Sequence, residues 1–169
     1  VLFYILVSIN IAKSEELFGI KLYQNSKDIL SIDFINTYKK KNIETKSGFW
    51  FLPINNINSP YFKNISIIID NEDYIHQIQG MSFYNNIERC KNFLKTYTNS
   101  ISRKKGFKLN PYYVRDYGTF IEHSFSAIKT SSFHHIGCIN NFSDKTIYMF
   151  YNLRTSYYAN AVSNFYSQD

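Results

Sequence analysis

Residues 85–106, NNIERCKNFLKTYTNSISRKKG, predict one long amphipathic helix. Asn85 suits the N-cap position, and Glu88 follows three residues later, which is the spacing of a capping box. Gly106 is typical of the residue that ends a helix. Five apolar side chains recur at helical spacing and therefore share one face: Ile87, Cys90, Leu94, Tyr97 and Ile101. We expect this face, including Cys90, to be buried.

The segment before this helix predicts a β-hairpin. Apolar residues alternate along 61–70, DNED at 70–73 suits a turn, and 74–83 returns. Other elements are expected as follows: a docking segment at 16–22, a helix at 25–42 capped by Ser26, strands at 48–54, 131–140 and 145–154, a strand or irregular chain at 119–129, and a short helix at 155–168. This order predicts an α+β two-layer sandwich, in which an antiparallel sheet carries one long helix across one face, plus an N-terminal helix.

The opening run, VLFYILVSINIAKSEE, has the length of the apolar region of a signal peptide. It is shorter than the roughly 20 residues that a membrane span needs. Ala12 and Ser14 form a small-residue cleavage pattern, so cleavage is expected after Ser14, with Glu15 as the first mature residue. We therefore expect a signal peptide at 1–14 and a single α+β domain at 15–169. The alternatives are a buried first element and an uncleaved leader that tethers the domain at a membrane.

The two cysteines, Cys90 and Cys138, predict one disulfide bond, since an even count in an exported chain is typical of structural disulfides. The bond would join the long helix to a late strand. Two separate buried thiols are the alternative. Together with the opening run, this pairing predicts a periplasmic or secreted protein with no stable membrane span after cleavage.

The formal net charge of +6 raises the possibility of nucleic-acid binding. The basic residues are mostly lysines, however, and arginine is the preferred reader of phosphates and base edges. The basic runs at 39–41 and 103–105 fall where helices are expected to end, which suits the helix dipole. We therefore expect no nucleic-acid partner. The abundance of Ile, Asn, Lys, Phe and Tyr is what an A/T-rich genome would impose.

No catalytic motif is present in the sequence: there is no phosphate-binding loop and no nucleophile elbow. The candidates for a His–carboxylate pair are His123, Glu122 and Asp116. His134 and His135 are adjacent on an expected strand and should point to opposite faces, so they cannot share one metal ion. No metal site and no cofactor are expected.

Three stretches, ELFGIKL, ISIIIDNEDYIHQIQG and IERCKNFLKTY, are similar to small uncharacterised exported proteins of A/T-rich bacteria, to which no activity is attached. The resemblance implies an exported, disulfide-bearing α+β domain and carries over no catalytic residue. The expected function is a non-catalytic envelope domain that binds a protein or a small ligand. The alternatives are an exported hydrolase-like enzyme with a His–carboxylate pair and a membrane-tethered envelope domain.

Overall fold

A computed structural model describes residues 15–41, 48–129 and 131–166, with the side chains of 162–166 excepted. Seven antiparallel strands form one sheet in the order β3-β4-β5-β9-β8-β7-β6, and β1 pairs with β2 in a separate two-stranded hairpin. Ser14 and the rest of the expected signal peptide lie outside the described residues. The elements are β1 (Glu16–Leu17), β2 (Ile20–Lys21), α1 (Ile32–Lys41), β3 (Trp50–Ile54), β4 (Asn64–Ile69), β5 (Ile75–Tyr84), α2 (Ile87–Lys105), β6 (Tyr113–Asp116), β7 (Phe120–Lys129), β8 (Ser132–Asn141), β9 (Thr146–Thr155) and α3 (Ser156–Tyr166).

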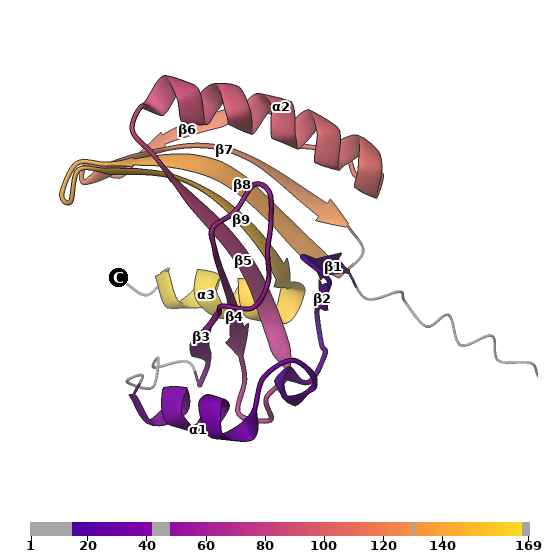
Figure 1. The fold of residues 1–169 in the computed structure, drawn as a ribbon. Helices are drawn as coiled ribbons and strands as arrows, with labels where there is room; N and C mark the ends of the chain where they lie inside the picture. Colours follow the sequence, from indigo (N-terminus) through magenta and orange to yellow (C-terminus); the bar gives the residue numbers. More distant parts are fainter. Residues whose placement is uncertain (1–14, 42–47, 130, 167–169) are drawn as a thin grey trace, which may run out of the picture.

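The predicted α+β class is confirmed, with α2 packed across one face of the sheet (Figure 1). The short helix α3 lies on the opposite side of the sheet from α2, a position that the sequence did not indicate. The undecided segment at 119–129 is strand β7.

Two helices begin at other residues, and with other capping residues, than the sequence predicted. The side chain of Asn86, and not Asn85, accepts hydrogen bonds from the backbone N–H groups of Glu88 and Arg89 at the start of α2. The expected helix at 25–42 is also broken. Asn25 caps a short 3-10 turn (Ser26–Asp28), and α1 begins at Ile32, where the Ser31 hydroxyl accepts from the N–H of Phe34.

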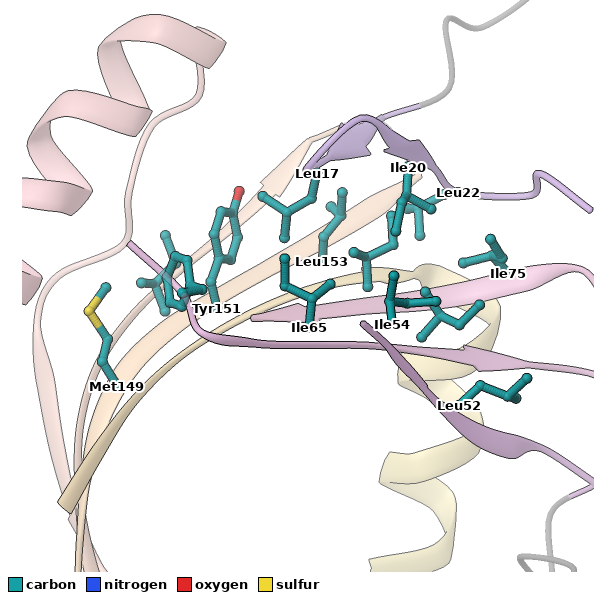
Figure 2. Close-up of a cluster of buried hydrophobic side chains, with 14 of the residues drawn as sticks. Leu17, Ile20, Leu22, Leu52, Ile54, Ile65, Ile75, Met149, Tyr151 and Leu153 are labelled. Carbon is teal, nitrogen blue, oxygen red and sulfur yellow. The ribbon is translucent and has the colours of Figure 1, made fainter. Parts of the chain in front are cut away.

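The core lies on the sheet face that carries α2, which packs over β8, β9 and β5, and it also includes Ile35 of α1. Alternate residues of the strands point into it, as Figure 2 shows for Leu52, Ile65, Tyr151 and Leu153. Leu94 of α2 is fully buried there. The β1–β2 hairpin adds Leu17 and Ile20 to the same core, so the expected docking segment at 16–22 does pack against the domain.

Gly80 of β5 sets how closely the β1–β2 turn approaches the sheet. A Cβ atom at this position would lie 2.5 Å from Phe18 and 2.7 Å from Phe62, so only glycine leaves room for both rings. The turn itself uses left-handed backbone at Phe18 (φ 58°) and Gly19 (φ 80°). The hairpin is thereby held over the sheet beside α2.

The predicted disulfide between Cys90 and Cys138 is present and joins α2 to β8, with the two Cα atoms 6.1 Å apart. Both cysteines are fully buried. Among the described residues, no helix is both long enough and apolar enough to cross a bilayer.

Replacing both cysteines by alanine should lower the free energy of unfolding by about 4 kcal/mol. The bond joins residues with a sequence separation of 48, and without it the unfolded chain regains the conformational entropy of the closed loop. Urea unfolding followed by circular dichroism, compared with the wild-type chain, gives this difference. A loss under about 1 kcal/mol would show that packing alone holds α2 on the sheet.

Candidate functional site

The three residues expected to form a His–carboxylate site do not meet. Glu122 and His123 are neighbours on β7, so they point to opposite faces of the sheet. His123 lies on the α2 side, with its Nδ1 2.8 Å from the hydroxyl of Tyr112. Asp116 ends β6, and its carboxylate accepts the N–H of Gly118 in the following turn. This set of three residues therefore forms no site.

Glu122 instead meets a different histidine on the sheet face away from α2. Its Oε1 atom is 2.8 Å from Nε2 of His135 and also accepts a hydrogen bond from the hydroxyl of Ser124. The Tyr113 hydroxyl is 2.9 Å from the same Nε2 atom. We call these four residues, which come from β6, β7 and β8, the Glu122 cluster.

Gly137 makes this meeting possible. It pairs with Ser124 across β7 and β8, and Glu122 and His135 lie two residues away on their respective strands. A Cβ atom on Gly137 would lie 2.7 Å from the Ser124 Cβ and 2.8 Å from the ring of Phe150. Only glycine therefore lets Ser124 and Phe150 pack directly against this position, which lies between Glu122 and His135.

The Glu122 side chain is only 8% exposed, yet its carboxyl group is held in its charged form. Burial is the largest influence and by itself raises the pKa of Glu122. Hydrogen bonds from His135 and Ser124, together with the charge of His135, outweigh burial and leave that pKa below its ordinary value. The cluster therefore holds a buried carboxylate whose charge is stabilised by hydrogen bonds to His135 and Ser124.

The geometry of the Glu122 cluster does not suit nucleophilic catalysis. A serine nucleophile must be reachable and must donate to a base. Ser124 is fully buried, and its hydroxyl donates a hydrogen bond to the Glu122 carboxylate. The same carboxylate is also hydrogen-bonded to His135. The cluster instead links β7 to β8 and β6 as a satisfied polar network.

The other histidines serve the fold. His134 is buried on the α2 side, as the expected alternation with His135 requires, and its Nδ1 lies 2.8 Å from the Tyr151 hydroxyl. Burial lowers the pKa of His134 to about 4. His76 contacts Asp70 and Thr155 at the other end of the sheet. In the part of the chain that the structure describes, no three His, Cys, Asp or Glu side chains gather where they could hold a metal ion.

A groove of about 680 Å³ with aromatic residues in its lining runs along α2. Three segments that are distant in sequence form its walls: the β1–β2 turn (residues 16–19), the loop at 59–61 and one side of α2 between Phe93 and Lys105. We call it the α2 groove. The sequence pattern had placed Tyr97 and Ile101 on the buried face of α2, and both reach the groove.

The aromatic wall of the α2 groove is pre-formed by ring contacts. Tyr97 stacks with Phe93 at 5.8 Å and meets Tyr61 edge-on at 5.3 Å, both measured between ring centroids. Phe62 lies beneath, 5.5 Å from both Tyr97 and Phe18. Burial raises the pKa of Tyr97 well above its ordinary value, so its hydroxyl stays neutral. The groove thus presents fixed aromatic rings, which bury large area at low cost in side-chain entropy.

Replacing Glu122 by glutamine should lower the free energy of unfolding at pH 7 by about 2 kcal/mol, because His135 loses a charged, buried hydrogen-bond partner. The pKa of Glu122 is lowered in the folded chain, so its stabilising effect is present above the unfolded carboxyl pKa of about 4.3 and is lost as the pH falls below it. Urea unfolding at pH 7 and at lower pH should show the gap to wild type closing.

His123→Gln is the matched control, since His123 is adjacent on β7 but on the opposite face. We expect it to change the free energy of unfolding by less than about 1 kcal/mol. Equal effects of the two substitutions would mean that the Glu122 cluster contributes nothing special to stability.

The Glu122 cluster and the α2 groove have to be interpreted from their own chemistry, because comparison with known proteins gave no match. No protein-family model matches the chain, and no curated protein matches it at a significant level.

Proposed function

We propose that this chain is a small exported domain without catalytic activity, which binds a small organic ligand with an apolar body in the α2 groove. The observation that carries the proposal is the groove itself. Its volume of about 680 Å³ falls within the range of roughly 300–1,000 Å³ that is usual for ligand sites.

The composition of the groove wall supports binding of an apolar body. Rings from three separate segments, Phe18, Tyr61 and Phe93, line it together with Tyr97 and Ile101. A few polar groups, including Thr96 and Ser100, stand along the α2 side. Aromatic walls with few polar groups are what ligand pockets commonly show. Tyr61 is half exposed, so part of this apolar area is open to a ligand.

The proposed absence of catalysis rests on what lines the groove and on the Glu122 cluster. Among the described residues that line the groove there is one carboxylate, Glu16, and no histidine or cysteine. The buried pair of His135 with Glu122 lies on the sheet face away from the groove, and its polar atoms bond within the Glu122 cluster. The pair therefore supports sheet stability better than it supports hydrolysis.

Export is supported by the disulfide and by the opening run of the sequence. Disulfides of this kind persist in oxidising compartments such as the periplasm or the extracellular medium. The apolar run at 1–12 ends in Ala12, and Ala12 with Ser14 has the pattern of a signal-peptide cleavage site, so the proposed mature chain begins at Glu15.

Mass spectrometry of the chain recovered from the periplasm or the medium of a producing bacterium tests the export proposal. We expect a mature N-terminus at Glu15 and the Cys90–Cys138 bond oxidised. An N-terminus at Val1 in a chain that stays in the cytosol would contradict it.

A groove-filling substitution tests the proposed binding function. Ser100 lines the groove and is exposed, so Ser100→Phe should place a ring in the groove without disturbing the core. Nile red, a neutral apolar dye, should bind the wild-type chain and lose at least about tenfold in affinity for the variant, a loss of about 1.4 kcal/mol in binding free energy.

Asn92→Phe is the matched control, because Asn92 is an exposed residue of α2 that lines neither the groove nor the hollow beside it. Its affinity for Nile red should equal that of the wild type. Failure of the dye to bind the folded wild-type chain, or equal binding by all three proteins, would overturn the proposed function.

A further inference from the structure

We propose that the ligand of the α2 groove is an amphipathic anion: a free organic molecule with an apolar body and a carboxylate at one end. This inference rests on the proposed function and adds the charge and the orientation of the ligand. The body would lie along Phe93 and Tyr97, and the carboxylate would lie at Lys104 and Lys105.

The groove has two chemically different ends. Phe93, Tyr97, Ser100 and Lys104 follow one another on successive turns along the same side of α2. From Phe93 to Lys104 this side of the helix extends about 16 Å, at 1.5 Å per residue. Aromatic rings lie at the Phe93 end, where Tyr61 also contacts Tyr97. A ligand as long as the groove would therefore meet rings at one end and ammonium groups at the other.

The basic end has more positive than negative charge in its lining. Lys104 and Lys105 line it together with one carboxylate, Glu16. The nearby Glu15 carboxylate is engaged at 2.8 Å by Lys129. Lys104 is exposed, and its ammonium group has no hydrogen-bond or ion-pair partner within the described ranges. Arg103, exposed on the same turn of α2, adds to the positive potential.

Lys105 is a second group that can receive the carboxylate. Its ammonium donates one hydrogen bond, at 2.5 Å, to the backbone oxygen of Glu16, and an ammonium has three donors. Burial is the main cause that lowers the pKa of Lys105. The charges of Lys129 and Lys104 lower this pKa further, and together these effects outweigh Glu15 and Glu16, which raise it. The charged form of Lys105 is therefore less stable here than in water, and a bound anion would stabilise it.

The last carbonyls of α2 carry partial negative charge, so an anion at this end depends on the lysine side chains. A cationic amphiphile would face two lysines and lose the interaction. A neutral one would gain only the aromatic contacts. The charge of the ligand head should therefore decide affinity by way of Lys104 and Lys105.

Three probes that share a twelve-carbon chain separate these cases: dodecanoate, dodecan-1-ol and dodecyltrimethylammonium. Each would be titrated below its micelle concentration against the folded, oxidised chain, with displacement of Nile red as the readout. We expect dodecanoate to bind at least about fivefold more tightly than the alcohol, the scale of a partly exposed ion pair, and the cation to bind most weakly. Equal affinities for the three probes would overturn the inference.

Charge reversal of one lysine provides the second arm. Lys104→Glu should weaken dodecanoate about fivefold and leave dodecan-1-ol unchanged. Lys95→Glu is the matched control, since it makes the same charge change on an exposed position of α2 that does not line the groove. Thermal melts should confirm that both variants fold. Equal losses of dodecanoate affinity in the two variants would show that only net charge matters and would contradict a seated carboxylate.

The outcomes also distinguish this inference from the proposed function. If all three probes displace Nile red equally, the groove binds ligands without selecting an anion, so only the present inference fails. If neither Nile red nor any of the probes binds, both fail.

Discussion

The position of α2 on the sheet is the constraint on which the rest of the structure depends. The Cys90–Cys138 bond fixes the first turns of the helix to β8, and Leu94 and Tyr97 pack against the same sheet face further along. Such a bond stabilises chiefly by limiting the unfolded chain, whereas the apolar stripe supplies burial. Together they fix both the location and the rotation of the helix, so one side faces the core and the adjacent side remains open.

The open side of α2 becomes a groove only because two other segments approach it. Gly80 admits Phe18 and Phe62 close to the sheet, which places the β1–β2 turn opposite the helix. The groove is therefore a by-product of core packing and is as rigid as that core. The other sheet face is held by polar contacts. There Ser124 and Phe150 pack directly against Gly137, and the buried polar groups of Glu122, Ser124 and His135 bond to one another.

The sequence predicted the parts of this structure that depend on local patterns. The stripe from Ile87 to Ile101 located α2, and the paired cysteines located its bond to β8. The predicted N-cap, Asn85, was wrong by one residue, because the adjacent Asn86 has the same capping side chain. Contacts that depend on strand register were out of reach. His135 meets Glu122 only because of the register in which β7 pairs with β8, where Lys129 lies opposite Ser132. The sequence left open whether 119–129 forms a strand, so it could not predict this register. The groove needs three distant segments together, which no local pattern encodes.

Binding at the α2 groove is the central claim, and amide chemical-shift mapping tests it most directly. Dodecanoate would be added to the ¹⁵N-labelled, oxidised chain. The account predicts that the shifted amides gather along α2 from Phe93 to Lys105, in the β1–β2 turn at 16–19 and in the loop at 59–61. Shifts gathered instead around Glu122 and His135 on the opposite sheet face, or no shifts at all, would contradict it.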